Sequence, residues 1–250
     1  MTRSPALNQN IIYPDSDGQP MSDNTKQFNW IVSIKLGCEA LFKDDPQVFV
    51  AGDLLWYPVE GDNTIRAAPD TMVVFGRPKG DRGSYQQWKE DNIAPQVAFE
   101  VLSPGNTLVG MAKKFRFYER YGIEEYYLYD PDKGDFSGWL RSGAFLEVIE
   151  TPIGWVSPHL KVRFELVDGE LELYRPDGEK FSTHLELIEQ NQQAQQQLEQ
   201  SQQQLEQSQQ QLEQSQQQLE QERQQLEQER QRSGKLAAKL KALGINPEEL

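Results

Sequence analysis

The chain has 250 residues and a formal net charge of -14, a length that suits one or two domains. Both sides of residue 183 are acidic, which excludes the broad basic surface of non-specific nucleic-acid binders. One cysteine, Cys38, excludes a disulfide framework, and no stretch is apolar enough for a signal peptide or a membrane span. We therefore expect a soluble, cytoplasmic protein, in which a nucleic-acid partner would need a local basic strip or bound metal ions.

The first part of the chain places one helical segment before two apolar strands. Residues 1–22 are polar and contain Pro and Gly, so we expect them to be loosely ordered. Residues 23–43 repeat apolar side chains every three or four positions, which predicts a helix. Residues 47–60 and 65–76 are apolar and β-branched, which predicts strands. The polar stretch 77–95 is long for a simple connection and is predicted to contain a short helix.

A second helix is predicted between two further strands. Residues 96–102 read as a buried strand that runs into the turn "SPGN". Residues 107–121 have helical character, and Gly122 is suited to end that helix at its C′ position. We expect a mixed α/β domain over residues 23–183. It is completed by a strand and two hairpins, at residues 124–134, 135–150 and 162–179.

The sequence changes abruptly in character at residue 184. Residues 184–233 contain neither Gly nor Pro and repeat leucine every seven positions, which predicts a long helix in a left-handed coiled coil. Half of the predicted seam is glutamine or arginine, so a solvated single helix is the alternative. Gly234 is expected to interrupt the helix, and residues 234–250 to form a short terminal helix. The repeated leucines are Leu198, Leu205, Leu212, Leu219 and Leu226.

One residue of the 96–102 strand conflicts with its surroundings. Glu100 lies between Phe99 and Val101 in an otherwise apolar run. A carboxylate there loses much of its hydration, and this is unfavourable unless a cation or hydrogen-bond donors compensate. Glu100 is therefore the first candidate functional residue.

Two other charged residues are candidate partners of Glu100. Asp70 stands at the start of an apolar strand in "AAPDTMVVF", although an ordinary Pro-Asp turn is the alternative. On a helical wheel, Lys114 falls between Tyr118 and Tyr121, on the aromatic side of its helix. An inward lysine needs an inward carboxylate, unless its stem lies along the rings and its amino group reaches water.

Asp70, Glu100 and Lys114 together suggest metal-assisted chemistry. Paired carboxylates suit Mg²⁺ or Mn²⁺, which are hard cations that take oxygen ligands. Such an ion would offset the repulsion between the carboxylates, polarise a phosphate oxygen and lower the pKa of a bound water. Lys114 would orient that water or stabilise the charge of the transition state. This set predicts hydrolysis of phosphodiester bonds.

The segments "APDTMVVF", "FEVLSPGNT" and "KFRFYERYGIEEYYLYDPD" resemble the Uma-type restriction endonuclease family of cyanobacteria, long catalogued as a domain of unknown function. That family belongs to the PD-(D/E)XK nuclease superfamily. The resemblance covers roughly residues 10–180 and implies an αβββαβ core, a divalent metal and DNA as the substrate. The family's aspartate falls on Asp70, its strand glutamate on Glu100 and its helix lysine on Lys114.

The sequence departs from the wider pattern in two places. The superfamily's usual lysine, two residues after the glutamate, falls on Leu102 and is absent, and an acidic residue common in the family is replaced by Gly110. Glu39, on the first helix, matches a place where the superfamily often adds a further carboxylate. A basic strip on the second helix would position phosphates, or is an ordinary solvated face: Lys113, Arg116 and Arg120.

The sequence thus predicts a DNA endonuclease that depends on Mg²⁺ or Mn²⁺, with Asp70, Glu100 and Lys114 as catalytic residues. Asp70 and Glu100 are the predicted metal ligands, and the coiled coil is predicted to join two chains as a homo-oligomer. One alternative is a nuclease-fold scaffold that no longer cleaves, which Gly110 and the acidic charge favour. The other is a phosphodiesterase that acts on RNA or small nucleotides.

Overall fold

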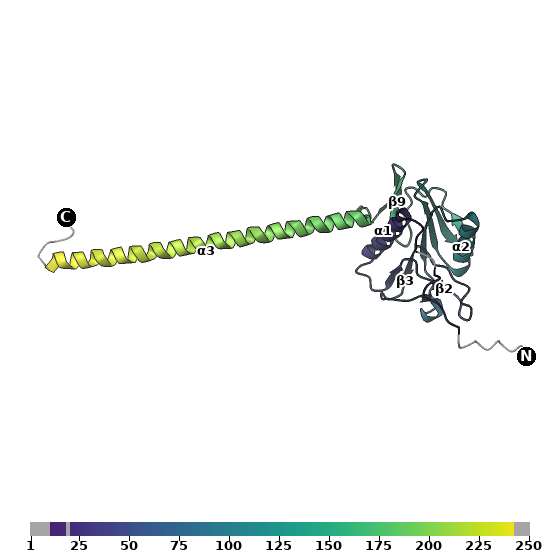
Figure 1. Cartoon of the computed structure of the whole chain (residues 1–250), viewed down its shortest axis with the longest axis horizontal. Helices are drawn as coiled ribbons and strands as arrows, with labels where there is room; N and C mark the ends of the chain where they lie inside the picture. Colours follow the sequence, from purple (N-terminus) through teal and green to yellow (C-terminus); the bar gives the residue numbers. More distant parts are fainter. Residues whose placement is uncertain (1–10, 19–20, 243–250) are drawn as a thin grey trace, which may run out of the picture. The chain divides into compact units, whose positions relative to one another are not determined.

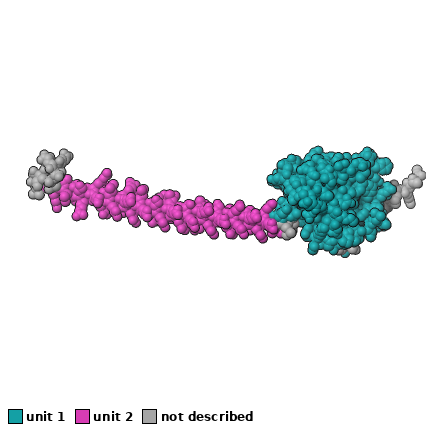
Figure 2. All heavy atoms as spheres, turned by 90° about the horizontal axis from the view of Figure 1, so that it is seen from above, with its two compact units in different colours: residues 1–187 teal, residues 188–250 magenta. Residues whose placement is uncertain are grey.

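The computed structural model of the chain describes residues 11–18 and 21–242. The chain divides into two compact units, residues 1–187 and 188–250, which Figure 2 shows in different colours. The first unit carries both predicted helices and the strands that the structure describes, and the described part of the second unit is helical (Figure 1).

A mixed six-stranded sheet forms the centre of the first unit. Its strands are ordered β1–β3–β5–β6–β7–β8. The central pair β5 and β6 is parallel, whereas all other neighbours in this sheet are antiparallel. The strands are β1 (Val48–Ala51), β3 (Thr71–Phe75), β5 (Val97–Val101), β6 (Glu125–Asp130), β7 (Asp135–Ser142) and β8 (Phe145–Val148).

Two helices complete the core. α1 (Thr25–Leu41) begins at Asn24, whose side chain accepts a 2.8 Å hydrogen bond from the Gln27 amide. α2 (Leu108–Tyr121) connects the parallel strands β5 and β6 and ends at Gly122, which has a φ of 101° that suits glycine. The main elements follow the order α1, β1, β3, β5, α2, β6, so the predicted mixed α/β fold with an αβββαβ core is confirmed.

The sheet separates two apolar clusters. Ile31 and Ile34 of α1 pack in one cluster, and Tyr118 of α2 packs in the other. Successive strand residues point to opposite faces. In β5, Val97, Phe99 and Val101 belong to the α1 side, so Ala98 and Glu100 point to the α2 side. In β3, Met72 and Val74 belong to the α2 side, and the same alternation directs Asp70, two residues before Met72, towards α2.

The strand expected over residues 47–60 is interrupted. β1 ends at Ala51, and a separate strand, β2 (Trp56–Tyr57), pairs in parallel with β4 (Tyr85–Gln86). Asp53 lies between β1 and β2 with a φ of 47°, a left-handed conformation that cannot continue a strand. The short helix expected within residues 77–95 is a 3₁₀ helix, η1 (Gln87–Lys89).

Part of the N-terminal segment is held by the fold, contrary to the expectation of loose order. The Tyr57 hydroxyl donates a 2.7 Å hydrogen bond to the Pro14 carbonyl. The Tyr13 ring packs against the rings of Tyr57 and Trp88, with centroid distances of 5.2 and 4.8 Å. These ring contacts join residues far apart in the sequence, so the polar composition of the segment did not predict them. Residues 1–10 lie outside the described part of the chain.

The β9 (Arg163–Val167) and β10 (Glu170–Tyr174) strands form a hairpin whose apolar side chains join the cluster beneath α1. Beyond it, α3 (His184–Ala242) is continuous through Gly234, so the predicted interruption there is wrong. One glycine costs about 1 kcal/mol relative to alanine, which is too little to end a helix of good helix formers. Residues 243–250 lie outside the described part of the chain.

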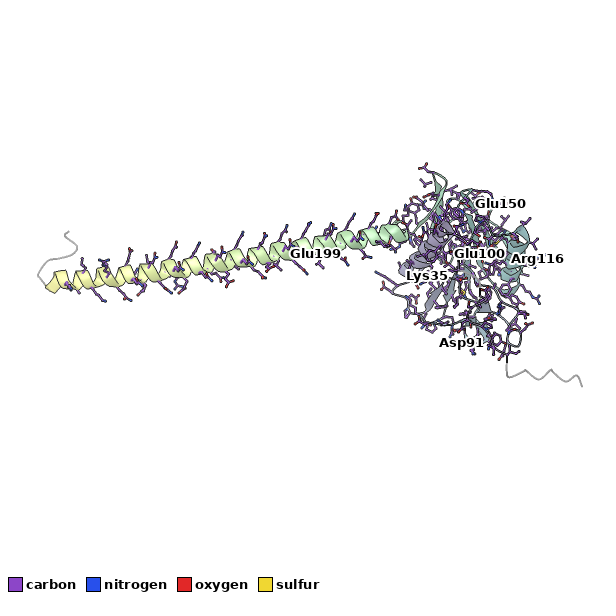
Figure 3. All side chains as sticks on the ribbon, in the orientation of Figure 1. Lys35, Asp91, Glu100, Arg116, Glu150 and Glu199 are labelled. Atoms are coloured by element: carbon purple, nitrogen blue, oxygen red, sulfur yellow. The ribbon has the colours of Figure 1, made fainter. Side chains whose placement is uncertain are left out.

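The five regularly repeated leucines of α3 face solvent. Their exposed fractions lie between 55% and 62%, and Glu199 marks the repeat region in Figure 3. The second unit therefore presents a leucine stripe that nothing within the described chain covers: Leu198, Leu205, Leu212, Leu219 and Leu226. Among the residues that the structure describes, no helix has the length and apolar character needed to cross a membrane.

Candidate active site

Glu100 is buried and is held from α2 by two side chains. Its exposed fraction is 3%. The Lys114 amino group lies 2.7 Å from Oε2, and the Tyr118 hydroxyl donates to Oε1 over 2.5 Å. Lys114 and Tyr118 are four residues apart, which places them on the same face of α2. One cation and one hydroxyl therefore compensate the buried charge.

Asp70 enters the same region from β3. It is 7% exposed, and its Oδ2 accepts a 2.7 Å hydrogen bond from the Val101 amide. The β3–β5 register pairs Thr71 with Phe99, and one further step places Asp70 opposite Glu100. Burial and the negative charge of Glu100 raise the pKa of Asp70 well above its usual range. Without a further cation, the site therefore disfavours two ionised carboxylates, because Lys114 does not fully offset their burial and mutual repulsion.

Lys114 is a cation in this setting. Burial alone lowers the pKa of the Lys114 amino group, but Glu100 and Asp70 outweigh this effect and raise the pKa above its usual value. The amino group also donates a 3.2 Å hydrogen bond to the Ala68 carbonyl. Lys114 is therefore protonated at neutral pH, so it can donate hydrogen bonds and stabilise negative charge but cannot accept a proton.

A cleft of about 570 Å³, called here the active-site cleft, opens beside these residues. Asp70 and Lys114 line it, and through Lys114 the cleft is one side chain away from Glu100. Charged residues of both signs line this cleft, so it is a polar site rather than an apolar pocket. They are Asp17, Asp23, Asp53, Asp70, Arg66, Lys113 and Lys114.

The basic strip of α2 is divided by the fold. Lys113 lines the active-site cleft, but Arg116 and Arg120 do not. The Arg116 side chain is 78% exposed and lies 3.2 Å from Glu119, and Figure 3 shows it at the periphery of the unit. Arg120 lies over the Tyr121 ring. The structure therefore brings only Lys113 of this strip to the candidate site.

Glu39 is also separate from the candidate site. Its carboxylate lies 2.7 Å from the Lys35 amino group, and both side chains are partly exposed. Glu39 lines a different cleft from Asp70. α1 buries Ile34 and Cys38 against the sheet, and this orientation directs Glu39 away from Asp70 and Glu100.

Comparison with known proteins agrees with the predicted family. The family model Uma2, described as "Putative restriction endonuclease", matches residues 8–159. The chain belongs to the Uma2 family. Among solved structures, the chain is similar to a protein from Anabaena variabilis ATCC 29413 described as "a putative nuclease belonging to DUF820". The two are 17% identical with a TM-score of 0.42, over 56% of this chain and 74% of that chain, which is too distant to support an argument about the site. No curated protein matches the chain.

Two residues near the site of this Uma2-family chain escaped the sequence analysis. Asp53 lines the active-site cleft, and burial, Asp17 and Glu100 raise the pKa of its carboxyl group. The signal was the "GD" pair inside an apolar stretch, which is typical of a turn. Tyr118 was read only as part of an aromatic face, although it stands one helical turn after Lys114.

The carboxylates of the Uma2-family site suit a hard divalent cation. Among the described residues, no three His, Cys, Asp or Glu side chains form a ready-made metal site. Mg²⁺ is commonly held by one or two carboxylates, with water and substrate phosphates completing its coordination. Asp70 and Glu100 meet that requirement, because the oxygens that accept a hydrogen bond, Asp70 Oδ2 and both oxygens of Glu100, each keep a further lone pair. A bound cation would also offset the repulsion from Glu100 that helps to raise the pKa of Asp70.

Replacing Tyr118 by phenylalanine is expected to lower the free energy of unfolding by about 1.5–3 kcal/mol, the usual value of a hydrogen bond to a charged group. The change removes only the hydroxyl that donates to Glu100 Oε1. Urea unfolding would measure the loss. The matched control is Tyr121→Phe, because the Tyr121 hydroxyl makes no hydrogen bond within the described chain. Equal losses in both variants would contradict the role assigned to Tyr118.

Glu125 is a second buried glutamate with a different environment. It is fully buried, and its carboxylate accepts hydrogen bonds from the hydroxyls of Tyr127 and Ser157 and from the His159 amide. No lysine or arginine pairs with Glu125 in the described part of the chain. Glu125→Gln is therefore expected to lower the free energy of unfolding by about 1–3 kcal/mol, which urea unfolding would measure. An unchanged free energy of unfolding would contradict the structural role assigned to Glu125.

Proposed function

We propose that this chain is a divalent-metal-dependent endonuclease that hydrolyses phosphodiester bonds in DNA. The observation that carries the proposal is the buried pair Asp70 and Glu100, on adjacent strands, with the protonated Lys114 at the edge of a cleft. Membership of the Uma2 family supports it. Two carboxylates and one lysine supply a metal site and a fixed positive charge, which are the two requirements for attack on a phosphodiester.

Each residue of the proposed site has a separate role in the reaction. Asp70 and Glu100 would hold Mg²⁺ or Mn²⁺, which when bound polarises a phosphate oxygen and lowers the pKa of a bound water. The water gives up one proton to the surrounding solvent as its oxygen forms a bond to phosphorus, the ester P–O bond breaks, and the leaving oxygen takes up a proton from solvent. Lys114 donates a hydrogen bond to the attacking water or to the phosphate and stabilises the negative charge that builds there. Tyr118 keeps Glu100 in position by its hydrogen bond to Oε1.

Gly110 does not weaken this assignment. The Gly110 amide donates a 3.1 Å hydrogen bond to the side chain of Thr107, which caps the N-terminus of α2. Lys114 is already held by Glu100 and by the Ala68 carbonyl. An acidic residue at position 110 is therefore not needed to hold the lysine.

Nicking of supercoiled plasmid tests the proposal. The purified chain is expected to convert plasmid to open circles in Mn²⁺ or Mg²⁺ and to leave it intact in EDTA. Unlabelled RNA added in excess should compete poorly if DNA is the substrate. Inert protein across both ions would contradict the proposal and favour a scaffold on a nuclease fold, and strong competition by RNA would favour the ribonuclease alternative.

We also propose that α3 joins two copies of the chain. Its leucine stripe has the seven-residue period of a left-handed coiled coil and is exposed in the single chain. Leu205→Gln combined with Leu212→Gln is expected to halve the mass measured by light scattering, and removal of residues 184–250 is expected to give the mass of a single copy of residues 1–183. The control is Gln203→Ala, which leaves the leucine stripe intact. A leucine variant with the wild-type mass, or a truncated chain with the mass of two copies, would contradict the pairing.

A further inference from the structure

A second cleft, of about 480 Å³, lies along β1 at the free edge of the six-stranded sheet. The end of α1, β1 and the segment 79–82 line it. It is called here the basic cleft, because its lining contains four cationic side chains and two acidic ones in a chain whose net charge is -14. These residues are Lys35, Lys43, Lys79 and Arg82, with Glu39 and Asp81.

Two of these cations are not neutralised by an acidic group. Lys43 is exposed, and neither Lys43 nor Lys79 takes part in an ion pair within the described part of the chain. The Lys79 amino group donates to the carbonyl oxygens of Phe42 and Lys43, at 2.6 and 2.9 Å. These contacts fix the position of the Lys79 amino group and leave it without an acidic side chain as an ion-pair partner among the described residues.

The other two cations are paired but keep their place in the cleft lining. Lys35 pairs with Glu39, and the two side chains are 32% and 42% exposed, so water screens that pair. Arg82 pairs with Glu90 at 2.7 Å and lies over the Phe49 ring, 3.9 Å from its centroid. The basic cleft therefore contains the fixed guanidinium group of Arg82. It also contains the amino groups of Lys43 and Lys79, which have no ion-pair partner within the described chain.

The basic cleft and the active-site cleft lie on either side of one stretch of backbone, residues 52–55. Gly52 and Leu54 line the basic cleft, whereas Asp53 and Leu55 line the active-site cleft. The Asp53 amide lies 3.3 Å from the Asp70 carbonyl oxygen, which ties this stretch to β3. A Cβ atom at Gly52 would lie 3.4 Å from the Asp70 carbonyl oxygen and 3.5 Å from Lys35 Cγ. A single stretch of backbone at Gly52 therefore lies between Lys35 of the basic cleft and Asp70 at the start of β3.

We propose that the basic cleft binds the phosphodiester backbone of the nucleic-acid strand whose cleaved bond lies at Asp70 and Glu100. This inference rests on the proposed nuclease function. The active-site cleft contains four acidic and three basic side chains in its lining, so it does not itself attract a polyanion. Lys43 and Lys79 would supply that attraction, and contacts to phosphates hold a strand in register without reading its sequence.

The test measures DNA affinity as a function of salt in the full chain. Fluorescence anisotropy of a labelled DNA duplex, in Ca²⁺ without Mg²⁺ or Mn²⁺, gives the dissociation constant over a series of KCl concentrations. Lys43→Gln and Lys79→Gln are each expected to weaken binding and to reduce the slope of log K against log salt by about 0.9, the value for one phosphate contact. Lys161→Gln makes the same charge change outside both cleft linings and should leave the slope unaltered.

The outcomes separate this inference from the proposed function. Reduced slopes with normal nicking rates at saturating DNA would support the basic cleft as a backbone site. A wild-type chain that binds and nicks DNA, with variants of unchanged slope, would overturn the inference and leave the proposed function standing. A wild-type chain that neither binds nor nicks DNA would remove both. Lys43 is exposed, so Lys43→Gln carries the test even if Lys79→Gln lowers the melting temperature.

Discussion

Glu100→Gln is expected to slow plasmid nicking about a thousandfold in Mn²⁺. Glutamine has the shape of glutamate but lacks the charge that a divalent ion requires. The loss corresponds to about 4 kcal/mol of transition-state stabilisation, which is in the range of the contribution of a catalytic metal ion. The variant loses the ion pair with Lys114, but it is expected to fold, because the Tyr118 hydroxyl can still donate to the amide oxygen and Lys114 keeps its hydrogen bond to the Ala68 carbonyl. Circular dichroism and a thermal melt verify this before rates are compared. Initial rates of open-circle formation measure the effect.

Glu125→Gln is the matched control for this experiment. It makes the same chemical change at another buried glutamate, on the adjacent strand β6, where the partners are neutral donors. Its nicking rate should equal that of the wild type. Wild-type activity in Glu100→Gln, or equal losses in both variants, would show that the position of Glu100 beside Lys114 has no special importance for cleavage.

Lys114→Met is expected to reduce nicking about a hundredfold while metal binding persists. Methionine keeps much of the apolar stem but removes the charge that contacts Glu100 Oε2. Without metal, the buried carboxylates lose their cation, and we expect the free energy of unfolding to fall by about 3–5 kcal/mol. The loss of one group that stabilises transition-state charge typically reduces the rate of a step by about 10²–10³. Nicking assays and thermal melts measure the two effects separately.

The change in melting temperature on adding Mn²⁺ tests whether Lys114 and a bound ion compensate the same carboxylates. A bound ion would replace the missing positive charge, so Mn²⁺ should raise the melting temperature of Lys114→Met more than that of the wild type. Lys113→Met is the control, because Lys113 lines the same cleft but makes no contact with Glu100. An identical response to Mn²⁺ in all three proteins would contradict the view that Lys114 and the metal share the charge of the carboxylate pair.

The sequence was informative where the pattern is local. Helix α2 begins after Thr107 and ends at Gly122 because of capping preferences that the sequence displays. The orientation of Glu100 follows from strand alternation, and the inward position of Lys114 from the helical period. A buried charge also requires partners, so one carboxylate in an apolar strand predicts a nearby cation such as Lys114.

Features that depend on distant parts of the chain were not predictable in this way. Asp53 reaches the active-site cleft only because the backbone turns between β1 and β2. Glu125 accepts hydrogen bonds from Ser157 and His159, more than thirty positions later, and no local pattern in the sequence indicates these contacts. Glu39 was a candidate because the sequence predicts a helix there but does not show which face of that helix is buried. Packing of α1 against the sheet decides that face.

Titration of the full chain with Mn²⁺ by calorimetry, for the wild type, Asp70→Asn and Glu100→Gln, tests whether the buried carboxylates form a metal site. Binding by the wild type is expected, with a marked loss of affinity in each variant, and circular dichroism would verify that all three proteins are folded. Equal binding in all three proteins, or none in the wild type with DNA present, would contradict the metal site. Glu100 would then be a structural partner of Lys114 and Tyr118, and the chain a scaffold built on a nuclease fold.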